Sequence, residues 1–150
     1  MNDDRRAYRQ TLGTFATGVC VVTIGEPGNG LGLTINSFTS VSLEPRLILW
    51  CLDDRSDRYA AFNAADRFSV HILSEDQQPL SERFAFGTPT ISAHEADLFD
   101  GALGRLDCRV YQRIDVGDHQ VMIGEVETFN SRPGTPLLYV RGQYGQVKSA

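Results

Sequence analysis

Short apolar segments rich in β-branched residues follow one another along this chain, mostly joined by links of hairpin length. Such runs predict buried strands, and strict alternation of apolar and polar residues predicts strands with one exposed face. The expected strands are residues 19–24, a segment that begins at residue 32, 46–52, 67–73, 105–116, 119–129 and 137–141. In the fourth of these, the alternation points Phe68 and Val70 inward and His71 outward.

Glycine, proline and asparagine mark the turns. Glu26–Gly30 is expected to close a hairpin between the first two strands, and Gly117–Asp118 is a tight turn that leads directly into His119. Residues 87–104 show no clear period and are interpreted as a long loop.

Three helices are expected from apolar residues that recur at spacings of three and four. They cover residues 3–16, 53–65 and 78–86. Ser56 is a candidate cap for the second helix, and Pro79 suits the first turn of the third. No βαβ unit and no glycine-rich phosphate loop accompany them. The fold class is therefore mainly β, an antiparallel barrel with peripheral helices.

Composition fits a single globular domain over residues 1–150, with 41% hydrophobic and 22% charged residues. A net charge of −5 without a Lys/Arg block argues against nucleic acid and anionic membranes as partners. No apolar run approaches the ~18 residues that a spanning helix needs. The charged N-terminal segment MNDDRRAYRQ lacks an apolar signal core, so a cytoplasmic location is expected. Cys20, Cys51 and Cys108 are interpreted as free thiols in a reducing compartment.

The stretch Gly32–Ser42, GLTINSFTSVS, begins as a strand and becomes a run of hydroxyl side chains. Buried hydroxyls and amides need partners, so such a run indicates a ligand, a turn or ordered water. A planar polar ring that ends in a phosphate would use these groups well, and Asn36 can both donate and accept at a ring edge. A Ser/Thr-rich connection that caps a neighbouring element is the alternative.

Other chemistry-bearing residues are sparse. His71, His94 and His119 lack the spacing of metal ligands, so no metal is expected. His119 at a turn can contact a ligand or simply face solvent, and a hydrogen-bonded pair with its neighbour Asp118 is not expected. The segment Arg55–Ser56 and Arg83 are candidate anion contacts, with surface ion pairs as the alternative for each arginine.

The segment FATGVCVVTIGEPGNGLGLTINSFTSVSLEP, residues 15–45, closely resembles the short-chain flavin reductase family. These proteins are reductase partners of two-component flavin-dependent monooxygenases and have the FMN-binding split-barrel fold. The resemblance continues through ERFA (82–85), GALGRLDCRV (101–110), GDHQVMIGEVETF (117–129) and LLYVRGQYG (137–145). Departures from the usual pattern are Arg46, where a second proline is common, Trp50 in place of a small apolar residue, and residues 87–100.

The resemblance implies site residues at positions that match the family motifs. The flavin would contact Thr34, Asn36, Ser37, Ser40, Ser42, Cys51, Ser56 and Arg83, and the nicotinamide nucleotide would contact His119 and Tyr144. The implied activity is hydride transfer from NADH or NADPH to FMN or FAD, with no catalytic side chain, because the cofactors carry the chemistry. The family is homodimeric and passes reduced flavin to a monooxygenase. An amine oxidase of the pyridoxamine phosphate oxidase type and a non-catalytic flavin- or haem-binding module are the alternatives.

Overall fold

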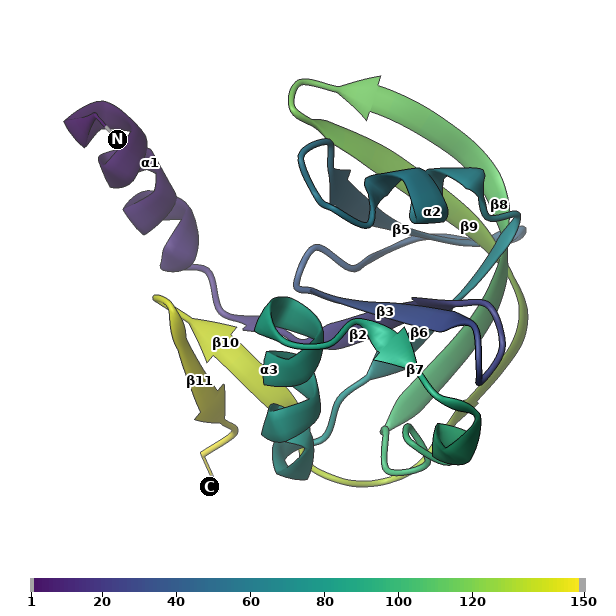
Figure 1. Ribbon diagram of the computed structural model, residues 1–150. Coiled ribbons are helices and arrows are strands. Elements are labelled where there is room, and N and C mark those ends of the chain that lie inside the picture. The colour runs from purple at the N-terminus through teal and green to yellow at the C-terminus, as the bar shows by residue number, and fades with distance from the viewer. Residues whose placement is uncertain (1, 149–150) are drawn as a thin grey trace.

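The computed structural model describes residues 2–148, and strands dominate it (Figure 1). In chain order the elements are α1 (Asp3–Gly13), β1 (Thr17–Gly18), β2 (Cys20–Ile24), β3 (Gly30–Ile35), β4 (Thr39–Leu43), β5 (Arg46–Asp53), α2 (Tyr59–Ala64), β6 (Arg67–Ile72), η1 (Glu75–Gln77), α3 (Gln78–Phe86), β7 (Thr90–Ile91), η2 (Ala93–Glu95), β8 (Gly104–Val116), β9 (His119–Ser131), β10 (Leu137–Val140) and β11 (Gln143–Gln146). Among these described residues, no helix combines the length and apolar character that crossing a membrane requires.

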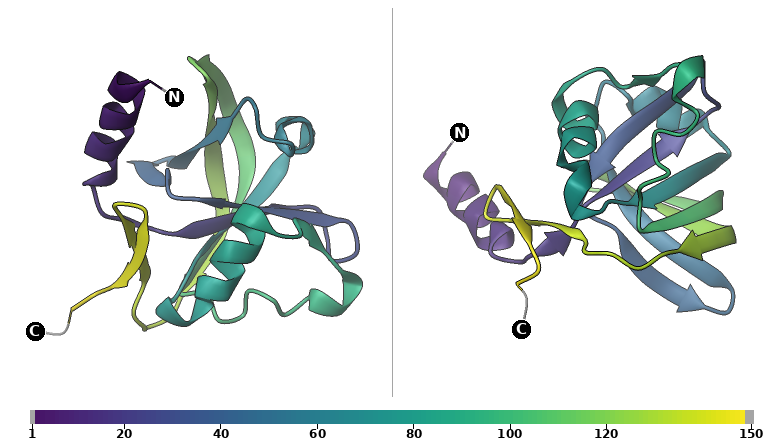
Figure 2. Two further views of the ribbon diagram at one scale, coloured as in Figure 1. Left: turned by 60° about the vertical axis from the view of Figure 1, so that its left-hand side comes forward. Right: turned by 90° about the horizontal axis from the view of Figure 1, so that it is seen from below.

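Two antiparallel sheets carry the fold. The larger has the strand order β4-β5-β9-β8-β6-β2-β3-β7, and the smaller has the order β1-β10-β11. Figures 1 and 2 show the large sheet curling into a barrel, with α3 outside it beside β2 and β3. The expected architecture, an antiparallel barrel with helices at its periphery, is confirmed.

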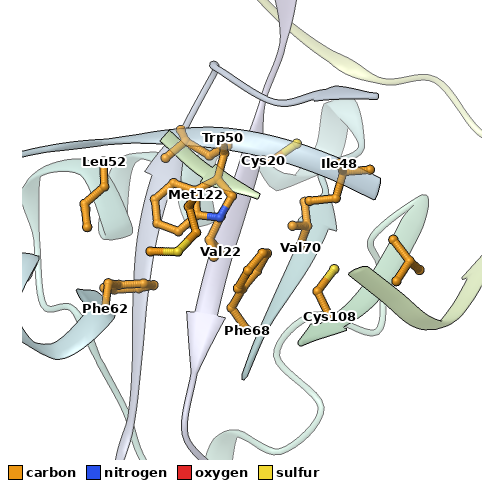
Figure 3. Packing of buried hydrophobic residues seen from close by; sticks show 12 residues of the cluster. Cys20, Val22, Ile48, Trp50, Leu52, Phe62, Phe68, Val70, Cys108 and Met122 are labelled. Carbon is orange, nitrogen blue, oxygen red and sulfur yellow. The ribbon is translucent and has the colours of Figure 1, made fainter. Parts of the chain in front are cut away.

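The barrel interior is filled around Trp50, which is fully buried (Figure 3). Its ring meets Phe62 of α2 and Phe68 of β6 edge to face, at centroid distances of 5.7 and 5.8 Å. Along β5, Ile48, Trp50 and Leu52 are buried while the residues between them are not, as the period of a strand requires. Trp50, a departure from the family pattern, therefore supplies much of the apolar volume of this core.

The predicted hairpins are confirmed. Glu26–Gly30 links β2 to β3, and Gly117, with φ of 60°, allows the tight turn between β8 and β9. The helix predicted over 78–86 is α3, with Pro79 in its first turn. The stretch Gly32–Ser42 is two strands, because β3 ends at Ile35 and β4 starts at Thr39.

The helix predicted over 53–65 is wrong in its first half, because α2 covers only Tyr59–Ala64. The preceding residues form tight turns, in which Ser56 N donates to Asp53 O at 3.0 Å. Ser56 is therefore not the cap; Arg58 holds that position without a side-chain capping bond. Arg58 is itself buried, and its Nη1 donates to the carbonyls of Gly32 (3.1 Å) and Phe84 (2.5 Å).

His71 lies on the face of β6 opposite Phe68 and Val70, as the alternation predicts, but that face is covered, and its side chain is only 2% exposed. Its ring stacks on Phe99 at 4.1 Å, and Nε2 lies 2.9 Å from Thr23 Oγ1. The segment interpreted as a loop, 87–104, contains β7 and η2 and covers this part of the sheet. A pattern along one strand cannot report a cover that comes from a distant segment.

The first helix ends at Gly13 rather than near residue 16, and none of its residues is buried. The predicted apolar stripe is present but does not pack against the barrel. Tyr8 and Leu12 are 65% and 57% exposed, and Phe15, just beyond the end of the helix, is 77% exposed. In Figures 1 and 2, α1 stands away from the barrel, with its last turn beside the turn between β10 and β11. Arg141 N donates to Gly13 O at 2.7 Å at this contact.

Candidate functional site

A cavity of about 290 Å³ opens where β3 ends, between α3 and the β10–β11 hairpin. Thr34 of β3 donates its hydroxyl to Ser81 O at 2.7 Å, and Ser81 Oγ lies 2.7 Å from the Tyr144 hydroxyl. The rings of Tyr139 and Tyr144 meet edge to face at 5.3 Å. Thr34, Tyr144 and the exposed Asn36 thus line one cavity that combines hydroxyls, an amide and aromatic surface.

A second group of predicted residues follows the β4–β5 edge. Ser37 Oγ accepts a hydrogen bond from Cys51 N at 2.9 Å. Ser40 and Ser42 lie farther along β4, on either side of a β-bulge that interrupts its pairing with β5. Burial raises the pKa of the Cys51 thiol, so this half-buried side chain stays protonated at neutral pH.

His119 begins β9 and pairs with Asp53, two residues beyond the pair of Cys51 with Val121. Its Nδ1 lies 2.7 Å from Asp118 Oδ1, so the carboxylate–imidazole pair that was not expected does form. This hydrogen bond lowers the pKa of Asp118. Asp118 therefore holds one ring nitrogen of His119, which leaves Nε2 available to donate or accept another hydrogen bond.

Ser56 lies in the turn that follows β5, where its Oγ accepts from Arg58 N at 3.2 Å. The same turn is tied to the His119 hairpin, because Asp54 N donates to Asp118 O at 3.0 Å. The structure therefore gathers Ser37, Ser56 and His119 around one end of β5, from segments that are far apart in sequence. Asn36, the neighbour of Ser37, connects this group to the cavity at the end of β3.

Arg83 is not among these residues. Its guanidinium makes four hydrogen bonds, two to the Glu95 carboxylate at 2.5 and 2.9 Å and two to the carbonyls of Thr88 and Thr90. Ser81 and Ala85 face the cavity, and Arg83, midway between them on α3, points to the other side of the helix. Arg83 braces the segment 88–95 in this structure, and its contact with a phosphate stays a prediction.

Two cavity residues were missed by the sequence analysis. Ser81 is fully buried and links Thr34 to Tyr144, but a serine in the middle of a helix carries no sequence signal for such a role. Tyr139 lies in a predicted strand, where an aromatic residue predicts packing in the core and not a binding role. Only the pairing of Tyr139 with Tyr144 across the hairpin brings it to the cavity.

These residues fit a flavin in chemical type. The aromatic pair Tyr139 and Tyr144 offers apolar surface to a planar ring, while Asn36 and the hydroxyls supply the polar contacts. The cavity also extends beyond Asn36 into a second one of about 410 Å³, which shares Asn36 and Tyr139 as walls. Together they give an elongated ligand room of the size that small-molecule sites have.

Comparison with known proteins identifies the family. The flavin reductase like domain matches residues 12–148. FMN reductase (NADH) SmoA of Agrobacterium fabrum is 39% identical over 96% of this chain and 87% of its own length. The reductase component of the flavin-dependent trigonelline monooxygenase of Acinetobacter baylyi is 40% identical over 93% of this chain. The match covers only 48% of that longer protein.

Among solved structures, the NADH:FAD oxidoreductase SgcE6 of Streptomyces globisporus superposes with a TM-score of 0.87 at 30% identity. The match covers 99% of this chain and 96% of that one, and SgcE6 has also been solved in complex with NAD and FAD fragments. The barrel described above is therefore the split-barrel fold of these reductases. On this evidence the chain belongs to the flavin reductase family.

Proposed function

We propose that this chain is an NAD(P)H-dependent flavin reductase that transfers a hydride from NADH or NADPH to FMN or FAD. The observation that carries the proposal is the convergence of Thr34, Asn36 and Tyr144 on one cavity in a chain of this family. Relatives named as an FMN reductase and an NADH:FAD oxidoreductase support both cofactors. The flavin, when bound, supplies the hydride-accepting ring, so the protein needs no side-chain acid or base.

The residues of this chain bind and orient. Asn36 and nearby backbone N–H groups would stabilise negative charge that develops on the ring. The hydroxyls of Ser37, Ser40, Ser42 and Ser56 and the Cys51 segment would hold the ribityl and phosphate portions along the β4–β5 edge. These contacts would position the flavin ring against the nicotinamide. Such positioning lowers the activation barrier of a reaction between two bound molecules.

His119 would orient the nicotinamide nucleotide. Asp118 fixes the imidazole through Nδ1, and the ring stands at the end of β5 beside the Ser37–Cys51 contact. A fixed ring donates or accepts a hydrogen bond to a ribose or phosphate at lower entropic cost than a free one. Tyr144 is proposed as its counterpart on the cavity side.

The functional unit is proposed to be a homodimer with the flavin near the subunit interface. On β5 and β9, the face opposite the core is apolar, and it carries Leu49, Cys51, Val121 and Ile123 in paired positions. An antiparallel sheet that faced water there would carry polar residues. His119 lies on the same face, so this interface would border the nucleotide site.

A flavin-dependent monooxygenase is the proposed recipient of the reduced flavin, as the name of the trigonelline monooxygenase reductase component suggests. We place the activity in the cytoplasm and in one domain. The three free cysteines, of which Cys20 and Cys108 are buried, suit a reducing compartment.

An anaerobic titration tests the proposed function. Purified protein is mixed with FMN or FAD, and NADH or NADPH is added without oxygen while flavin absorbance is followed. Bleaching of the flavin at a rate proportional to enzyme supports a reductase. A bound flavin that neither NADH nor NADPH bleaches, or oxygen-dependent oxidation of an amine without a nicotinamide, would contradict it.

His119→Ala tests the assigned orientation role. We expect the KM for NADH to rise about tenfold, as loss of a fixed hydrogen-bonding group predicts, while the Kd for FMN changes little. Steady-state kinetics and fluorescence titration measure the two quantities. Arg109→Gln is the matched control, because Arg109 pairs with Glu125 farther along the same β8–β9 hairpin, away from the turn that carries His119. Equal losses in both quantities would contradict the assignment.

A further inference from the structure

The cavity at the end of β3 is the first of three that adjoin. The second shares Asn36, Tyr139 and Gly142 with it. The third, of about 630 Å³, lies between α1 and the turn from β10 to β11, and it shares Arg9 and Arg141 with the second. These shared walls make one groove that leads from the proposed flavin ring position to the N-terminal helix.

The outer end of this groove is strongly basic. Arg6, Arg9 and Arg141 line it, and no Asp or Glu among the described residues lines any of the three cavities. None of the three arginines forms an ion pair within residues 2–148. The contrast is sharp in a chain whose net charge is −5. Three uncompensated guanidinium groups around one space indicate an anionic ligand, because like charges gathered without a counter-charge repel one another.

The backbone at Arg141 gives a second indication. Arg141 has φ of 52° and is the one non-glycine residue among those described with positive φ, and Gly142 follows with φ of 77°. A two-residue hairpin link with positive φ at both positions favours Asn-Gly or Asp-Gly. Arginine is disfavoured there by the clash of its Cβ with the following carbonyl. The side chain is therefore retained at a cost in stability, which is common where a residue serves a ligand.

The middle cavity also holds an unsatisfied group. Thr17 lines it, and the Thr17 hydroxyl oxygen is buried without a hydrogen-bond partner among the described residues. Such groups are rare in folded proteins and often bind a ligand or water. Phe15, at the mouth of the same cavity, offers an exposed aromatic ring.

We propose that this groove binds the ADP half of a dinucleotide, with its phosphates on Arg6, Arg9 and Arg141. The inference rests on the proposed function, because the redox ring of the same molecule would occupy the inner cavity or stack beside it. Guanidinium groups match phosphate oxygens with paired hydrogen bonds. Two molecules carry this chemistry, FAD and the nicotinamide dinucleotide, and FMN does not.

The first experiment measures ADP binding directly by isothermal titration calorimetry, with adenosine as the probe that lacks phosphates. We expect ADP to bind wild type more tightly than adenosine. Arg9→Gln and Arg141→Asn should each weaken ADP about tenfold, as removal of a charged hydrogen-bonding group predicts. Arg5→Gln is the matched control, because it removes the same charge from the same helix but does not line the groove. Equal affinities for ADP and adenosine, or an equal loss in Arg5→Gln, would overturn the proposal.

Arg141→Asn separates binding from folding. Asparagine suits the positive φ at this position, so the variant should have a higher melting temperature than wild type while it binds ADP less well. A residue kept only for structure would show the reverse. Lower thermal stability together with unchanged ADP affinity would overturn the reading of this turn.

The second experiment identifies which dinucleotide uses the groove. If FAD does, its flavin-side phosphate lies in the groove and not along the β4–β5 edge, so the arginine variants weaken FAD binding and leave FMN binding, which uses that edge, unchanged. If the nicotinamide dinucleotide does, they raise the KM for NADH with FMN as acceptor and leave the ratio of FAD to FMN affinities unchanged. If the arginine variants show neither of these changes while wild type reduces FMN normally, the proposal is overturned. Conversely, if NADH fails to reduce any flavin, the proposed function is contradicted. The calorimetric comparison of ADP with adenosine still tests the groove in that case.

Discussion

His71 shows how burial decides the state of a single side chain. Its ring lies under Phe99, and the resulting desolvation lowers its pKa from 6.5 to about 3. Nearby Arg105 lowers this pKa further and Asp107 opposes the change. The imidazole is therefore neutral in the folded protein at neutral and mildly acidic pH, where a histidine on the surface would titrate.

This difference makes stability depend on pH. In the unfolded chain His71 regains its ordinary pKa of 6.5, so between that pH and about 3 the unfolded state binds a proton that the native state does not. The free energy of unfolding contributed by His71 falls as pH falls through this window, by up to about 1.4 kcal/mol per pH unit. His71→Gln, which stays neutral and can reach Thr23, should flatten the decline between about pH 6 and 4 in urea denaturation. An unchanged slope would contradict this account.

At the same scale, residue roles were only partly predictable. Thr34 and Asn36 share a cavity, and Ser37 reaches Cys51, because these positions follow from the course of one strand and its neighbour. The partner of Arg83 was not predictable, because Glu95 comes from a segment without a periodic pattern. Hydrogen-bond geometry between neighbours, as in Asp118 and His119, needs side-chain angles that no sequence pattern reports.

Between elements, β3 and α3 pack closely at Gly32. A Cβ added to Gly32 would lie 2.6 Å from the ring of Phe84, a distance that real Cβ atoms do not reach. Gly32→Ala should therefore displace α3 and lower the free energy of unfolding by about 1–3 kcal/mol, the usual cost of overpacking. Gly18→Ala is the control, because a Cβ there meets nothing within 4 Å. Equal stability of the two variants in urea denaturation would contradict the role of Gly32.

Elements with a strong local signal were predictable, and those set by distant contacts were not. The β8–β9 hairpin follows from alternation and the Gly117 turn, and α3 follows from its spacing and Pro79. The helix expected over 53–65 fails because Arg58 is drawn inward to the carbonyls of Gly32 and Phe84, which fixes the turn before it. That contact joins residues 26 apart in the chain.

At the scale of the whole molecule, the hairpins were sufficient to predict an antiparallel barrel, since β2–β3, β4–β5, β8–β9 and β10–β11 each pair as neighbours in the chain. The other pairings, such as β5 with β9 and β6 with β2, join distant segments and were not predictable. The position of α1 was not predictable. An amphipathic helix is expected to cover the core of its own chain, yet α1 stands outside the barrel with its stripe exposed. An exposed apolar stripe of this kind indicates a contact with another molecule. In the proposed homodimer, that molecule would be the second subunit.

The dimer can be tested through this stripe. We expect wild type to sediment as a dimer and Leu12→Glu to weaken the dimer about tenfold or more, because a buried leucine contributes about 1.5–3 kcal/mol. Thr11→Glu adds the same charge one position away, off the stripe, and should remain dimeric. Sedimentation velocity over a range of concentrations gives both results. A monomeric wild type, or two variants that behave alike, would contradict the assignment.

The exposed N-terminal helix would also link the proposed dimer to the proposed dinucleotide site. A helix of 11 residues without a buried side chain is marginal in water by itself, so in the proposed homodimer the neighbouring subunit would stabilise it. Arg6 and Arg9 lie on that helix. Diluting the enzyme should then loosen its hold on adenine dinucleotides while FMN, anchored on the barrel, is held as before, so that subunit concentration itself becomes a control on which flavin is used.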